Sequence, residues 1–142
     1  MKKNVYAIID TETANGLKNP LCYDVAVIIF DKKGIELFRK NWLVSNVWNN
    51  ERMFKTAYYA WKRPLYDNIE KEIVNTYTFI CELNSIFEQY EVNYLLAYNL
   101  KFDLNSIEKT VSRFTYNSKF NTDNVEFIDV WNVAIDIIMN NN

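Results

Sequence analysis

No histidine occurs among the 142 residues of the sequence, and this absence removes several classes of chemistry. A chain without imidazole has no Ser-His or Cys-His catalytic pair, no histidine general base and no histidine-ligated metal. The only two cysteines, Cys22 and Cys81, are too few for a zinc site, and their apolar-periodic surroundings favour buried free thiols. A metal ion in this protein would therefore need oxygen ligands, which favours hard cations such as Mg²⁺ or Mn²⁺.

Long apolar runs and an excess of positive charge are also absent. No stretch approaches the ~18 residues of a membrane-spanning helix, and the apolar run after Lys3 is too short for a signal peptide. We therefore expect a cytoplasmic protein with no membrane partner. The formal net charge of −2 lacks the basic footprint of proteins that grip long stretches of phosphate backbone. It still permits an enzyme that holds a short nucleic-acid end through metal ions.

The sequence is rich in apolar residues, at 49%, and their spacing predicts regular elements in one domain. Strands are expected at 4–10, 21–30, 35–44, 94–99 and 125–131, helices at 69–90, 102–114 and 132–140, a loop at 13–20, and a short helix with an aromatic-rich loop at 46–66. Gly34 suits the tight turn between the second and third strands. This order predicts an α/β fold in which a three-stranded antiparallel meander joins parallel strands in one mixed sheet.

Acidic residues stand where two of the predicted strands end. Asp10 and Glu12 share one face of the first strand, and Asp103 begins the helix that follows the strand at 94–99. Three carboxylates around one point form a site for hard cations, and two such ions are a known solution for phosphodiester cleavage. Taken singly, each acid has a plainer interpretation, as a solvated turn residue or, for Asp103, as a helix cap.

Two segments resemble motifs of the DEDD-type (DnaQ-like) 3′–5′ exonucleases, which have a ribonuclease H-like fold. The segment "IIDTETA" is similar to their first motif and "LLAYNLKFDLNSIEKT" to their second, while "EFIDVWNVA" resembles the strand and helix that follow. The chain is also similar to exonuclease-like proteins of bacteriophages, which implies a bacterial or phage-infected cell. The resemblance covers nearly the whole chain in this order. It implies hydrolysis of terminal phosphodiester bonds of DNA or RNA with up to two Mg²⁺ or Mn²⁺ ions.

Carried over residue by residue, the resemblance implies that Asp10, Glu12 and Asp103 are the catalytic metal ligands. It also implies a group of residues that contact the terminal nucleotides of a single-stranded 3′ end: Thr11, Thr13, Asn99 and Phe102. The alternatives from residue type alone stay open, because Asn99 suits a turn, Phe102 suits the core, and both threonines suit ordinary strand or loop positions. Tyr98 stands where the family often has histidine.

The family's fourth acid and general base have no match in this sequence. Asp129 fits the end of the last strand, and Asp136 fits the surface of the final helix, with Trp131 and Asn132 where a histidine or tyrosine would be sought. We therefore expect residues 1–142 to form a single exonuclease-like domain that lacks its C-terminal helix and last motif. Loss of a general base alone reduces rates by ~10²–10⁴, so weak activity or none is expected.

A function of a different class stays open beside the exonuclease. The chain could be a catalytically impaired, exonuclease-like binding or inhibitory protein that acts on a protein or nucleic-acid partner. Aromatic residues in "VWNNERMFKTAYYAWKRPLY" would suit such an interface, although they equally suit packing over the sheet. A third alternative is a structural fragment completed by a second chain. The sequence does not set the oligomeric state.

Overall fold

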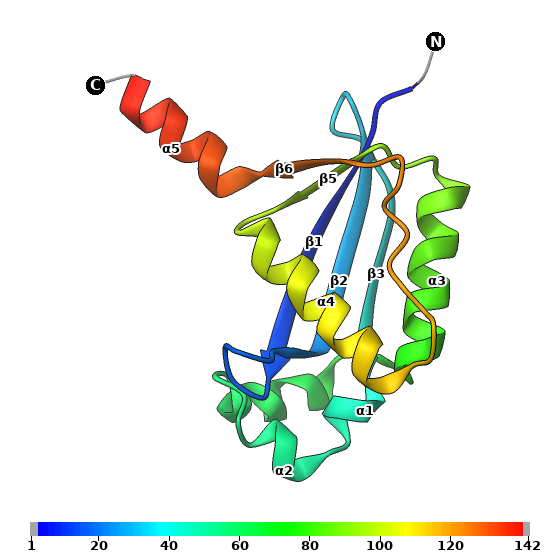
Figure 1. Cartoon of the computed structure of the whole chain (residues 1–142), viewed down its shortest axis with the longest axis vertical. Helices are drawn as coiled ribbons and strands as arrows, with labels where there is room; N and C mark the ends of the chain where they lie inside the picture. Colours follow the sequence, from blue (N-terminus) through cyan, green and yellow to red (C-terminus); the bar gives the residue numbers. More distant parts are fainter. Residues whose placement is uncertain (1–2, 141–142) are drawn as a thin grey trace.

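The computed structural model describes residues 3–140, and one mixed sheet organises them (Figure 1). Its six strands lie in the order β4-β3-β2-β1-β5-β6. Their bounds are β1 (Val5–Ala14), β2 (Leu21–Asp31), β3 (Glu36–Val44), β4 (Glu72–Val74), β5 (Tyr94–Ala97) and β6 (Glu126–Asp129). The first three strands form an antiparallel meander, and β4, β5 and β6 each join a neighbour in parallel. The predicted α/β fold is therefore confirmed.

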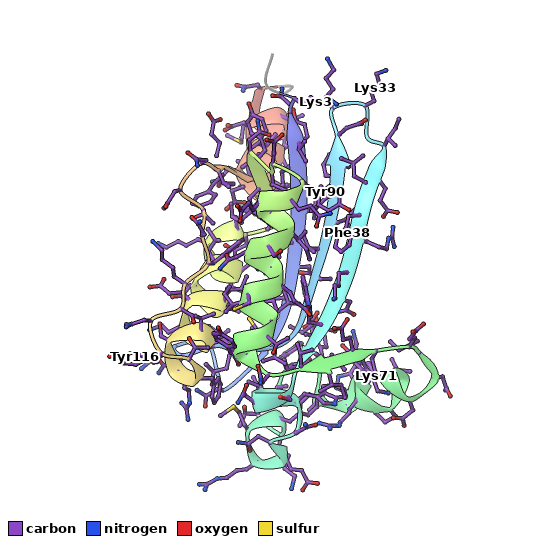
Figure 2. All side chains as sticks on the ribbon, turned by 90° about the vertical axis from the view of Figure 1, so that its right-hand side faces the viewer. Lys3, Lys33, Phe38, Lys71, Tyr90 and Tyr116 are labelled. Atoms are coloured by element: carbon purple, nitrogen blue, oxygen red, sulfur yellow. The ribbon has the colours of Figure 1, made fainter. Side chains whose placement is uncertain are left out.

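Two long helices, α3 (Thr76–Gln89) and α4 (Leu100–Phe114), lie on one side of the sheet (Figure 2). Alternation along β1 turns Val5, Ala7 and Ile9 toward these helices and leaves Ile8 and Asp10 exposed on the other face. The buried face of β2 continues this layer, and apolar residues of α3 and α4 complete the main core. The opposite face of the sheet is consequently open to solvent over much of its length.

A second apolar cluster closes the edge of the sheet where β1 and β3 end and β2 begins. Here the short helices α1 (Ser45–Trp48) and α2 (Glu51–Phe54) pack Trp48 and Phe54 around Tyr23. The 3₁₀ helix η1 (Ala60–Asn68) follows, and the guanidinium of Arg63 stacks on Trp48 and Phe54 at 4.1 and 4.5 Å. The segment 46–66, predicted as a short helix with an aromatic-rich loop, thus contains three short helical elements and is anchored on the sheet.

The predicted helix over 69–90 is wrong at its start. Residues Glu72–Val74 form β4 beside β3, and Asn75, in an extended conformation, caps α3 by accepting a hydrogen bond from the Thr78 amide at 2.8 Å. The apolar spacing of Ile69 and Ile73 mimicked a helical stripe, but both side chains are exposed. The expectation of two buried thiols is also half wrong, because Cys81 is exposed.

The last element, α5 (Val130–Asn140), extends from β6 away from the body of the molecule (Figure 1). None of its residues is buried. In the described part of the chain, no helix combines the length and apolar character needed to cross a membrane. Other predicted boundaries differ from the structure by a few residues; β1, for example, continues to Ala14 rather than ending at Asp10.

Candidate metal and nucleotide site

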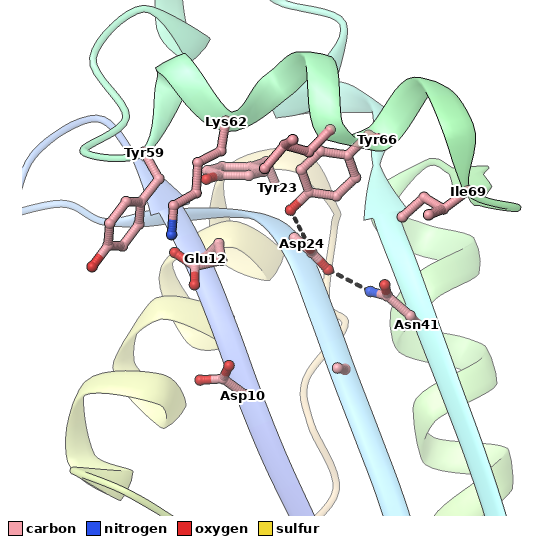
Figure 3. Close-up of a pocket in the computed structure, with 11 residues that line it drawn as sticks. Asp10, Glu12, Tyr23, Asp24, Asn41, Tyr59, Lys62, Tyr66 and Ile69 are labelled. Atoms are coloured by element: carbon pink, nitrogen blue, oxygen red, sulfur yellow. Dashed lines mark hydrogen bonds between the residues drawn. The ribbon is translucent and has the colours of Figure 1, made fainter.

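Asp10 and Glu12 project from β1 onto the open face of the sheet, as their i, i+2 spacing predicts (Figure 3). Thr11, between them, points the opposite way and is buried against α4. Its hydroxyl donates a 2.7 Å hydrogen bond to Oδ1 of Asp103, in the first turn of α4. A single strand therefore presents two carboxylates on one face and holds the third acid from the other.

Asp103 is an almost fully buried acid, with 4% of its surface exposed. Burial raises its pKa to about 6; the hydrogen bond from Thr11 works against this shift, and the nearby charge of Asp10 adds to it. The interpretation of Asp103 as a helix cap does not hold, because the capping position of α4 belongs to Asn99. A buried acid beside another acid is a costly arrangement that a cation would stabilise.

Glu12 carries the same electrostatic signature. Its pKa is raised first by burial and then by the charges of Asp10 and Asp24, with a smaller contribution from Asp103, while Lys62 lowers it. The charge of Asp103 thus reaches Glu12, although the sequence separates these two residues by more than 90 positions. The negative charge at this place is concentrated and incompletely neutralised.

Asp24 is a residue of this site that the sequence reasoning did not identify. It lies directly opposite Glu12 in the β1–β2 pairing, next to a bulge that inserts Tyr23 into β2. One of its oxygens accepts a hydrogen bond from the Asn41 amide, and the other accepts one from the Tyr66 hydroxyl at 2.5 Å. Both oxygens are engaged within the protein, so Asp24 is an anchor rather than a free ligand.

A pocket of about 370 Å³ opens above these acids (Figure 3). The open face of β1, β2 and β3 forms the floor of the pocket, and η1 with the residues beside it forms the opposite wall. The lining comprises Asp10, Glu12, Tyr23, Asp24, Ala26, Asn41, Tyr59, Lys62, Leu65, Tyr66 and Ile69. The volume falls in the range of small-molecule sites, about 300–1,000 Å³, and suits a ligand of the size of one nucleotide.

The structure does not gather all sequence-predicted site residues in this pocket. Only Asp10 and Glu12 line it, and Thr11 and Asp103 lie behind them on the α4 side. Thr13 is half-buried at the bulge, Phe102 is half-buried on α4, and Asn99 is exposed in a left-handed conformation that starts α4. The roles predicted for these three residues remain untested predictions.

The donor chemistry fits a hard cation, because Asp10, Glu12 and Asp103 offer only carboxylate oxygens. Their positions are less favourable: within residues 3–140 no group of three or more acidic or cysteine side chains is arranged so that it could hold a metal ion. The charge of Asp10 raises the pKa of both Glu12 and Asp103, but the three acids do not surround a common point. A bound cation would need them to draw together.

The two acids considered for the fourth position have other surroundings. Asp129 ends β6, where its Oδ1 accepts a 3.0 Å hydrogen bond from the Trp131 amide and so starts α5. Asp136 is exposed on α5. Cys22 offers no alternative nucleophile, since burial raises the pKa of its thiol to about 12.

Solved structures with this fold are found despite low sequence identity. The chain is similar to E. coli exonuclease I in complex with a dT13 oligonucleotide (TM-score 0.66, 14% identity), with 95% of this chain and 30% of that chain covered. The zinc-bound form of the E. coli exonuclease I–ssDNA complex gives a TM-score of 0.62 at 14% identity, covering 96% and 30% of the two chains. Exonuclease I of Methylocaldum szegediense gives 0.62 at 15% identity, covering 92% and 28%.

These matches establish the fold of this chain and show how much of the longer exonuclease I chain it covers. The chain has the ribonuclease H-like fold seen in exonuclease I, as its resemblance to DEDD-type exonucleases predicted, and spans about 30% of that protein's length. No protein-family model matches the sequence. No curated protein matches it in sequence either.

Proposed function

We propose that this chain is a divalent-metal-dependent 3′–5′ exonuclease domain that hydrolyses terminal phosphodiester bonds of single-stranded DNA. The observation that carries the proposal is that β1 presents Asp10 and Glu12 to a nucleotide-sized pocket and, through the Thr11 hydroxyl, holds Asp103 of α4 behind them. The shared fold supports it, because the similar E. coli structures hold oligonucleotides. RNA is the second substrate that this chemistry admits.

In this proposal Asp10, Glu12 and Asp103 would hold Mg²⁺ or Mn²⁺, up to two ions. The metal would supply an activated water and neutralise charge on the phosphate. Thr11 holds the Asp103 carboxylate in place through its hydroxyl. Asp24 stays outside the ligand set and fixes η1 above the pocket.

A 5′-labelled oligonucleotide incubated with the protein and Mn²⁺ tests this function. Shortening from the 3′ end in single-nucleotide steps is expected, with loss of at least about 100-fold in rate on Asp10→Ala. Asp123→Ala, which removes an exposed acid between α4 and β6, is the matched control and should retain the wild-type rate. Equal rates for Asp10→Ala and the wild type would overturn the site.

A non-catalytic binding protein on the same fold is the second candidate. Exposed Tyr58 and Trp61 on and beside η1 favour it, since aromatic side chains are enriched at protein interfaces. Calorimetric titration with Mn²⁺ separates the two. Absence of both metal binding and cleavage would support the binding protein and contradict the exonuclease.

A further inference from the structure

Lys62 is the single cation among the residues that line the pocket, and it faces the acids from η1 (Figure 3). Its charge lowers the pKa of Glu12, yet no carboxylate of residues 3–140 lies within ion-pair distance of its ammonium. The ammonium has two aromatic neighbours: it stands 4.0 Å from the ring centre of Tyr59, which lines the pocket, and 5.3 Å from that of the exposed Trp61. Rings at this range orient a cation without neutralising it.

The segment that carries Lys62 is fixed by two residues that follow it. Arg63 donates a 2.8 Å hydrogen bond to the Trp48 carbonyl and stacks on the second apolar cluster. The Tyr66 hydroxyl donates a hydrogen bond to Asp24 in the floor of the pocket. Lys71 adds a 2.6 Å hydrogen bond to the Tyr66 carbonyl. η1 and Tyr59, the residue that precedes it, therefore span the pocket as a strap with Lys62 and Tyr59 on its inner side.

A pocket with acids on one wall and a cation on the other suits a ligand that needs both. A nucleotide has this character: its phosphate is attracted by an ammonium and by any metal on the acids, and its base offers a planar face to a tyrosine ring. A purely cationic ligand would be repelled by Lys62, and a purely apolar one would leave Asp10, Glu12 and Lys62 without a partner.

We propose that η1 and Tyr59 form a substrate strap, in which Lys62 contacts the phosphate of the terminal linkage of a single-stranded nucleic acid and Tyr59 stacks against a terminal base. This inference rests on the proposed function, because it concerns the same site. It assigns to residues 59–66 the binding of the substrate's phosphate and base, for which Asp10 and Glu12 offer neither a positive charge nor an aromatic ring.

Fluorescence anisotropy with a 5′-labelled oligothymidylate tests the strap. Titrations use Asp10→Asn protein with Mn²⁺, because this background suppresses turnover during the measurement. Lys62→Ala in this background is expected to weaken binding by about tenfold and to reduce the slope of log K against log salt by about 0.7, the value for one phosphate contact with a single strand. Lys62→Arg should restore most of the affinity. Lys55→Ala, an exposed lysine after α2, is the matched control.

A second oligonucleotide with an uncharged methylphosphonate at its last linkage makes the test specific. With this probe, Lys62→Ala should have no effect on affinity, because the charge it contacts is already absent. An equal loss for both probes would mean that Lys62 acts on the acids and not on the phosphate, and would overturn the inference. Unchanged affinity for the unmodified probe, or no binding by the parent protein, would overturn it as well.

The cleavage assay on otherwise unchanged protein keeps the two proposals distinguishable. Binding that depends on Lys62 without any cleavage supports the strap and contradicts the exonuclease. Cleavage that does not depend on Lys62, with unchanged affinity, supports the exonuclease and contradicts the strap.

Discussion

At the scale of single residues, the hydrogen bond from Thr11 to Asp103 stabilises a buried carboxylate. The Thr11 hydroxyl is the side chain that donates to Asp103, and the pair joins β1 to α4 across 92 positions of sequence. A buried acceptor that loses its donor is left unsatisfied. The resulting loss of stability is larger than the net stabilisation that an ordinary hydrogen bond provides. Thr11 is therefore both a stability residue and a positioning residue.

Thr11→Val is expected to lower the free energy of unfolding by about 1–3 kcal/mol, because it leaves the Asp103 carboxylate short of a donor at nearly unchanged side-chain volume. It should also weaken Mn²⁺ binding, since the third ligand loses its orientation. Urea unfolding and calorimetric titration measure the two effects. Thr11→Ser keeps the hydroxyl and should retain metal affinity; equal metal affinity for Thr11→Val would show that Thr11 does not position Asp103.

Asp24 shows what sequence reasoning can and cannot find at this scale. Asp10 and Glu12 were predictable because an i, i+2 spacing alone places both on one face. Asp24 becomes their neighbour only through the cross-strand register and the bulge at Tyr23, and a one-residue slip would send it to the other face. A bulge depends on tertiary packing and leaves no simple mark in the sequence.

At the scale of elements, the anchoring of η1 on the sheet is the feature most open to test. Tyr66→Phe removes only the hydroxyl that binds Asp24. We expect a stability loss of about 1 kcal/mol and faster tryptic cleavage at Lys62, because η1 opens more often when this hydrogen bond is absent. Tyr58→Phe, at an exposed position just before η1, is the control and should digest at the wild-type rate. Indistinguishable digestion of the two variants would show that the hydrogen bond does not hold η1.

A charged network ties α3 to β3 on the buried side of the sheet. Glu82 accepts a 2.6 Å hydrogen bond from the Trp42 indole and pairs with Lys40 at 3.1 Å, and Lys40 also pairs with Glu72 at 3.0 Å. Burial acts to raise the pKa of Glu82, but the hydrogen bonds from Trp42 and Lys40 outweigh it and lower the pKa below the ordinary value of 4.5. The charged form of Glu82 is therefore the form that the fold stabilises.

This direction gives a pH dependence with a definite sign. Because the folded pKa of Glu82 is lowered, its contribution to stability is present above the unfolded value of 4.5 and is lost as the pH falls through the folded value. The wild type should exceed Glu82→Gln by up to about 1 kcal/mol at pH 7, since partial exposure screens the pair. Urea unfolding from pH 7 to pH 3 should show the difference vanish, whereas Glu88→Gln, on the exposed side of α3, should show none. A difference that persists at pH 3 would contradict the charge-based explanation.

Elements differ in how well the sequence predicted them, for a physical reason. The meander and α4 follow from strict periodicity and from a hairpin whose Gly34 has φ +79°. The strand β4 was missed because it has three residues, pairs with β3 only at the sheet edge, and carries apolar residues at helix-like spacing to α3. A short edge strand is stabilised by its neighbour and not by its own pattern.

At the scale of the whole molecule, charge and apolar surface are distributed unequally. Asp10, Glu12 and the strap occupy the open face of the sheet, while α3 and α4, with Asp103, cover the other. The chain covers only about 30% of the exonuclease I structures that share its fold, so the complete activity of those proteins is not implied for it. What this chain holds by itself is a core, a strap and three interacting carboxylates.

The exposed apolar side chains of α5 lead to a prediction about the behaviour of the molecule in solution. All seven large apolar residues of α5 are at least 37% exposed, and Trp131 contacts Tyr98 at 5.2 Å between ring centres. Exposed apolar patches favour association. The full chain should therefore show concentration-dependent self-association by analytical ultracentrifugation, and a chain that ends at Asp129 should show much less.

The same truncation should change the melting temperature by only a few degrees, because α5 contributes no buried residue to the core. Near-UV circular dichroism of the Trp42 and Trp48 environments should be preserved, since both side chains are buried in clusters that α5 does not join. A fall in the melting temperature of more than about 10 °C would place α5 in the cooperative unit of the fold. In that case the apolar side chains of α5 would stabilise this chain by packing against it and would not promote association with a second copy.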